Sequence, residues 1–99
     1  GRDIYITGHC ANENSGSAEA TLVCAAMTTL AQTIAQNVFD SEDTGDTDII
    51  DVTLRSGQAV ISYVTDDDGL NTAVDGICKG FDMLEENYPE YVSCCRSER

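Results

Sequence analysis

The chain has 99 residues, enough for one modest domain, and its 18 acidic residues against 5 basic ones give a net charge of −13. Hydrophobic residues make up 41% of the chain, which is a globular composition. Such a negative charge repels phosphate backbones and anionic lipid headgroups, so nucleic acid and membrane are poor partners and basic polypeptides are good ones. We therefore expect a single domain over residues 1–99.

In chain order, the first predicted element is a strand. "DIYIT" alternates around Ile4 and Ile6, and Gly8 ends it. The segment 10–17 is small and polar, as expected of a loop that closes over a ligand. A helix with Ser17 as N-cap follows, and its apolar residues at helical spacing are Val23, Met27, Leu30, Ile34 and Val38. The absence of charge from Ala20 to Val38 predicts burial on more than one side, and seven polar side chains make this stretch too polar for lipid.

The second half of the chain predicts a hairpin and a helix. Residues 39–48 form an acidic connector, and "IIDVTLRSGQAVISYV" alternates around a Ser56-Gly57 turn. The connector contains the triplet "DTG", which also occurs in aspartic proteases. No apolar strand precedes the triplet here, as such a site would require, so we expect a solvated loop. Residues 66–68, "DDD", lack calcium-loop spacing and instead cap a last helix. That helix has one apolar stripe, made of Leu70, Val74, Ile77, Phe81, Leu84 and Tyr88, before Pro89 stops it.

The predicted fold class is α+β, a small antiparallel sheet packed with two helices in the order β-α-β-β-α. Residues 93–99 are predicted to be a loose tail. Because three strands make a thin sheet, we expect either a partner strand or a missing N-terminal strand.

The five cysteines indicate a reducing compartment. They are Cys10, Cys24, Cys78, Cys94 and Cys95, an odd number that a secreted disulfide scaffold would not leave. No basic segment followed by an apolar core opens the given chain, so we expect a cytoplasmic protein with reduced thiols. The cysteines and His9 show no CxxC pair at finger-like spacing, so we expect no metal and no cofactor.

His9, the only histidine, and Cys24 could together do chemistry. A thiol attacks as its thiolate, which a helix N-terminus and a nearby imidazolium both stabilise. Cys24 sits near a predicted helix start, whose unpaired backbone N–H groups could also hold an oxyanion. By themselves a lone cysteine and a lone histidine are more often packing and chance.

The segments "GHC", "LVCAAMTTLAQTIAQNV" and "LEENYPEYV", with the hairpin between the last two, resemble the ribosomal-processing cysteine protease family, often called Prp. The resemblance covers roughly residues 4–92. Its most specific part is the Gly-His that is followed, after a loop, by an aliphatic-aliphatic-Cys-Ala helix start.

The resemblance implies a cysteine-type endopeptidase in which His9 and Cys24 are the catalytic pair. Family members trim an N-terminal extension from a large-subunit ribosomal protein and tend to form homodimers. Substrate-positioning residues would be Gly8, Asn14, Ser15, Gly16, Ser17 and Thr21. Thr21 stands where the family usually has Asp, the loop before Cys24 is longer, and the family's first strand is absent. A divergent member acting on a phage or mobile-element protein, such as a capsid component, fits these differences.

Two other functions stay open. The chain could be a non-catalytic acidic module, a pseudoenzyme that binds a basic protein. Alternatively, Cys10 and Cys24 could form a reversible disulfide that serves redox sensing.

Overall fold

The alternation of "RDIYITG" places three side chains of the first strand in the core. Arg2, Ile4 and Ile6 are buried, whereas Tyr5 and Thr7 lie exposed on the opposite face. The computed structural model describes residues 1–8, 18–55 and 57–98. Its elements are β1 (Arg2–Gly8), α1 (Ala18–Asp43), β2 (Thr47–Arg55), β3 (Gln58–Thr65), α2 (Asp68–Asn87) and β4 (Val92–Glu98).

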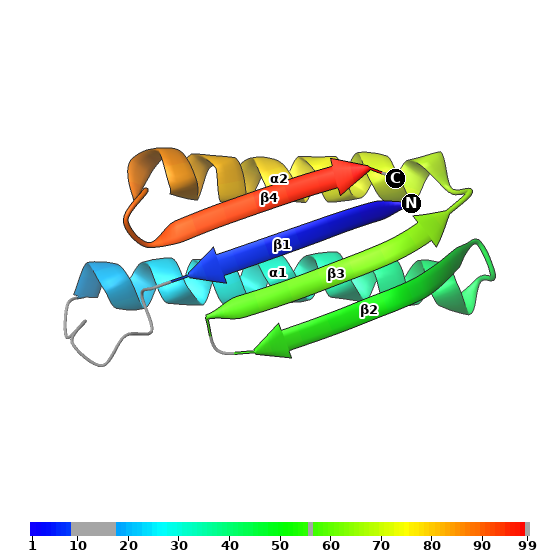
Figure 1. The fold of residues 1–99 in the computed structure, drawn as a ribbon, viewed down its shortest axis with the longest axis horizontal. Helices are drawn as coiled ribbons and strands as arrows, with labels where there is room; N and C mark the ends of the chain where they lie inside the picture. Colours follow the sequence, from blue (N-terminus) through cyan, green and yellow to red (C-terminus); the bar gives the residue numbers. More distant parts are fainter. Residues whose placement is uncertain (9–17, 56, 99) are drawn as a thin grey trace.

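The predicted α+β class is confirmed. A four-stranded antiparallel sheet, in the order β2-β3-β1-β4, has both helices on one face, and its other face is uncovered by the described residues (Figure 1). The core lies between the two layers. Its largest fully buried side chains are Tyr63, Phe81, Ile4, Ile34, Ile61, Val38, Val74, Val92 and Cys78.

The prediction of a loose tail at 93–99 is wrong. Val92–Glu98 forms β4 and pairs antiparallel with the whole of β1, from Gly8 opposite Val92 to Arg2 opposite Glu98. Arg99 lies outside the described residues. In the segment "VSCCRSE" only the first residue, Val92, is a buried hydrophobic residue. The segment therefore has no alternation of aliphatic residues from which a strand could be predicted. β4 is therefore the partner strand that the thin predicted sheet required.

Helix α1 begins directly after Ser17, as predicted, and is one-sided. Val23, Met27, Ile34 and Val38 are buried against the sheet. The expected burial on further sides is not found in the single chain. Thr21–Asp43 has the length and composition of a membrane span, a property that core helices of soluble proteins share, and only 33% of its most apolar part is buried.

Helix α2 is capped by the middle residue of the Asp66–Asp68 run. The side chain of Asp67 accepts a hydrogen bond of 2.8 Å from the backbone N–H of Gly69. Of the predicted apolar stripe, Leu70, Val74 and Phe81 are buried, and Ile77, Leu84 and Tyr88 are half-buried. At the other end, the backbone N–H of Tyr88 donates to the carbonyl of Leu84 at 2.7 Å, before Pro89.

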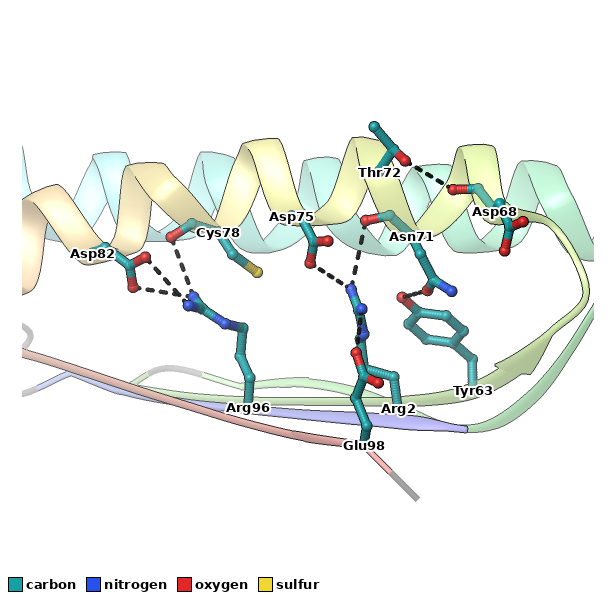
Figure 2. A network of polar contacts seen from close by, with 10 residues as sticks. All are labelled: Arg2, Tyr63, Asp68, Asn71, Thr72, Asp75, Cys78, Asp82, Arg96 and Glu98. Atoms are coloured by element: carbon teal, nitrogen blue, oxygen red, sulfur yellow. Dashed lines mark hydrogen bonds and ion pairs between the residues drawn. The ribbon is translucent and has the colours of Figure 1, made fainter.

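Two arginines join the sheet to α2 (Figure 2). Buried Arg2 donates from Nη1 to Asp75 Oδ1 at 2.7 Å and from Nη2 to Glu98 Oε1 at 2.6 Å. Arg96 donates from its two terminal nitrogens to both carboxylate oxygens of Asp82, at 3.0 and 3.2 Å. Burial lowers the pKa of Arg2, but the hydrogen bond to Glu98 and the charge of Asp75 outweigh it, and the pKa is raised. Arg2 thus links β1, β4 and α2.

We predict that Arg2→Met, which keeps the buried stem and removes the guanidinium, lowers the free energy of unfolding by about 1–2 kcal/mol. The loss is no larger because the side chains of Asp75 and Glu98 are more than half exposed to solvent. Urea unfolding measures the change. Arg55→Met is the matched control, because exposed Arg55 forms no ion pair with any described residue. Equal losses in the two variants would contradict a stabilising role for the Arg2 contacts.

Candidate active site

The predicted site falls partly on residues that the structure describes. Gly8, Thr21 and Cys24 lie in β1 and α1. The other predicted residues, His9, Asn14, Ser15, Gly16 and Ser17, lie outside the described residues, as does Cys10.

Gly8 ends β1 at a close approach of three elements. Its backbone N–H donates to the carbonyl of Gly57 at 2.9 Å. Gly57, in the turn between β2 and β3, has a φ of 80°, which glycine adopts without strain. A Cβ on Gly8 would lie 2.0 Å from Met27 Cε, and one on Gly57 would lie 3.1 Å from the Gly8 carbonyl oxygen. The two glycines therefore let β1, the hairpin turn and α1 meet.

A small pocket of about 90 Å³ opens where these elements meet. Its lining includes Cys24, Met27 and Thr28 from α1, with Gly8, Gly57 and Gln58. Cys24 is half-buried, and its carbonyl accepts a hydrogen bond of 2.9 Å from the Thr28 hydroxyl. The structure thus brings Cys24 beside Gly8, the residue that precedes His9 in the sequence.

Thr21 lies one turn before Cys24 on α1. It is exposed and is not among the described residues that line the pocket. The sequence did not indicate Met27 and Gln58 as parts of this site. The Ser56-Gly57 turn signal located the turn but gave no sign that it reaches the end of β1.

The expectation that Cys24 lies at a helix start is wrong. Because α1 begins at Ala18, Cys24 is its seventh residue, beyond the first turn, where the unpaired N–H groups and the effect of the helix dipole are concentrated. The predicted start of the helix after Ser17 is confirmed, and it places Cys24 nearly two turns into α1. An oxyanion held by the start of α1 would therefore lie away from the Cys24 thiol.

Two further thiols lie between α2 and β4. Burial raises the pKa of Cys94 to about 11, and the nearby Cys78 adds to the increase, while the Arg96 charge opposes it. Burial also raises the pKa of Cys78, whose side chain points from α2 toward the sheet (Figure 2). Both groups are thus held as uncharged thiols, which are poor nucleophiles. Among the described residues, no group of three or more His, Cys, Asp or Glu side chains could hold a metal ion.

Comparisons with protein-family models, curated proteins and solved structures find no match for this chain. The features of the chain that bear on its function are therefore the Gly-His and Leu-Val-Cys-Ala segments and the pocket that Gly8 and Cys24 share.

We predict that Gly57→Ala destabilises the protein more than Gly45→Ala does. Both glycines have positive φ values, 80° and 88°, so each substitution costs about 1–2 kcal/mol of backbone strain. Gly45 has nothing within 4 Å of its added Cβ, whereas Gly57 also meets the Gly8 carbonyl. Thermal unfolding of the two variants measures the difference. Equal losses would show that the turn can move away from β1 at no cost.

We also predict that Cys94 resists alkylation in the folded protein until the pH approaches 11. Unfolding in urea should restore the reactivity of an ordinary thiol, with a pKa of about 8.5. The measurement uses Cys95→Ser, because Cys94 and Cys95 fall on one tryptic peptide, between Lys79 and Arg96. Between a pH of about 8.5 and about 11, Cys94 is deprotonated in the unfolded state but still protonated in the folded state. The free energy of unfolding should therefore fall as the pH rises through this range. Cys94→Ala should reduce that fall, and alkylation at pH 9 that is as fast as in urea would contradict the raised pKa.

Proposed function

We propose that the chain is a cysteine endopeptidase, with Cys24 as its nucleophile and His9 as its general base. The observation that carries the proposal is the pocket shared by Cys24 and Gly8, because Gly8 is bonded to His9. Gly8 and Cys24, sixteen positions apart in the sequence, thereby line one pocket at one end of the sheet. The resemblance of the Gly-His and Leu-Val-Cys-Ala segments to the Prp family supports the same pair.

In this mechanism the His9 imidazole takes the proton of the Cys24 thiol. The thiolate attacks a peptide carbonyl carbon, and His9 then protonates the amine that leaves, which gives a thioester between Cys24 and the substrate. Water attacks the thioester, the carboxylic acid departs, and the thiol is restored. The N–H of Gly8 is bonded to Gly57, so Gly8 contributes close backbone approach rather than a donor.

A basic protein is the substrate class that the electrostatics favours. A net charge of −13 attracts a Lys/Arg-rich polypeptide and raises its encounter rate. By resemblance, the substrate is the N-terminal extension of a large-subunit ribosomal protein or of a phage structural protein, and the site is cytoplasmic. We assign substrate positioning to Gly8, Asn14, Ser15, Gly16, Ser17 and Thr21.

A non-catalytic binding module is the second candidate. The observation that favours it is the place of Cys24 in α1, because a thiol beyond the first turn lacks one of the two aids to thiolate formation. Such a module would hold the basic protein on the same acidic surface without cutting it.

We predict that His9→Ala slows the alkylation of Cys24 by iodoacetamide at pH 6.5 by about tenfold or more, since imidazole assistance is then lost. The measurement is made in Cys10→Ser, because one tryptic peptide between Arg2 and Arg55 carries both Cys10 and Cys24. Exposed Cys95 is the internal control, and its rate should stay unchanged. Fragment spectra separate it from Cys94.

Cleavage is tested with a pool of large-subunit ribosomal proteins that retain their N-terminal extensions, by sequencing of new N-termini. Cys24→Ser and His9→Ala should abolish cutting, while Cys95→Ser should retain it. Two results together would contradict the peptidase and favour the binding module. The chain would bind the pool without cleaving it, and the rate of Cys24 alkylation would not depend on His9.

A further inference from the structure

The pocket that Cys24 shares with Gly8 has a buried apolar floor and an exposed polar rim. The floor is formed by side chains that are at most 7% exposed, which are Ile6, Met27, Ala31 and Ala59. Arg55 and Gln58 also line the pocket, and because both are exposed they lie at its rim. Apolar walls with a few polar groups at the mouth are typical of a ligand site.

Strand pairing places Arg55 and Gln58 beside each other. Arg55 ends β2, Gln58 begins β3, and the two residues are directly opposite in the register of the hairpin. Side chains at such positions lie on the same side of a sheet, with Cβ atoms about 4.5–5.5 Å apart. The rim therefore offers the N–H groups of a guanidinium together with those of an amide.

Arg55 is also a cation that forms no ion pair with any described residue, although the chain has 18 acidic residues. Arg2 and Arg96, by contrast, are each bound to a carboxylate of α2. No Asp or Glu is among the described residues that line the pocket, so the lining offers the guanidinium no counter-charge. The rim thus carries a positive charge that can bind an anion.

We propose that this pocket binds a carboxylate group, which Arg55 and Gln58 hold at the rim beside Cys24. A guanidinium matches the oxygens of a carboxylate with two parallel N–H···O bonds. The apolar floor would contact the carbon atoms that carry the carboxylate, and a volume of about 90 Å³ limits them to a few. The group is either the side chain of an Asp or Glu or the free C-terminus of a polypeptide. Carboxylate binding does not require cleavage by Cys24, whereas a role of the pocket as a substrate subsite rests on the proposed function.

The test compares the alkylation of Cys24 by iodoacetate, which carries a carboxylate, with its alkylation by neutral iodoacetamide, at about pH 8, where imidazole is uncharged. Both reagents alkylate the same thiolate and release iodide, so the ratio of the two rates does not depend on how much thiolate is present. We expect the iodoacetate-to-iodoacetamide ratio at Cys24 to exceed the ratio at exposed Cys95 about tenfold. His9→Ala should leave the Cys24 ratio unchanged, which separates a failure of the carboxylate site from a failure of the peptidase.

Arg55→Met should lower the Cys24 ratio about tenfold, because it removes the guanidinium. Arg55→Lys should keep part of the preference, because it retains the charge without the planar fork. Lys79→Met is the matched control and should leave the ratio unchanged. Lys79 is an exposed cation of α2 that forms no ion pair with a described residue and is not among the residues that line the pocket.

Digestion after glutamate residues locates the label. The peptide from Ala20 to Glu42 contains Cys24 as its only cysteine, and none of these substitutions changes its ends. Residues 91–98 form the peptide that carries Cys94 and Cys95, which fragment spectra separate.

Two acetylated tripeptides identify the source of the carboxylate. Gly-Glu-Gly amide carries only a side-chain carboxylate, and Gly-Gly-Gly with a free C-terminus carries only a terminal one. If either peptide protects Cys24 from iodoacetamide, and the protection is lost in Arg55→Met, the site is supported and the source is known. Failure of both peptides to protect Cys24 would overturn the proposal. A Cys24 ratio equal to that of Cys95 in the parent chain, or lowered equally by Arg55→Met and Lys79→Met, would do the same.

Discussion

Strand β1 is hydrogen-bonded on both sides, to β3 and to β4, and the rest of the molecule is arranged around it. At its start, Arg2 reaches α2 through Asp75 and β4 through Glu98. At its end, Gly8 allows Met27 and the turn at Gly57 to approach. One end of this strand therefore links the sheet to α2, and the other end lines the pocket.

The central elements could be predicted because their side chains carry the signal. Ile4 and Ile6 alternate, and the Leu70 to Tyr88 stripe has helical spacing, so burial on one face follows from the sequence. β4 could not be predicted in this way, because it is joined to β1 by backbone hydrogen bonds and to α2 by Arg96. Neither interaction leaves a periodic pattern of apolar residues.

The candidate site, like the fold, could be predicted only in part from the sequence. The sequence indicated that a strand end with Gly8 and a helix with Cys24 could meet, and these two residues do share a pocket. The N-cap signal at Ser17 located the helix start correctly, but Cys24 is the seventh residue of that helix, so the expected place of its thiol at the helix N-terminus is wrong. The contact between Gly8 and Gly57 joins segments about fifty residues apart, and no local signal records such a contact.

The charge of the chain is unevenly distributed, because α1 carries none from Ala20 to Phe39. Two of the five basic residues, Arg2 and Arg96, form ion pairs with carboxylates of the same chain, and the net charge of the whole chain is −13. The basic substrate that we propose would be attracted by that charge. Cys24 and Ala25 are consecutive residues of α1: Cys24 lines the pocket, and Ala25 lines an apolar groove between α1 and α2. Consecutive helical residues point about 100° apart, so the pocket and the groove open on different sides of α1.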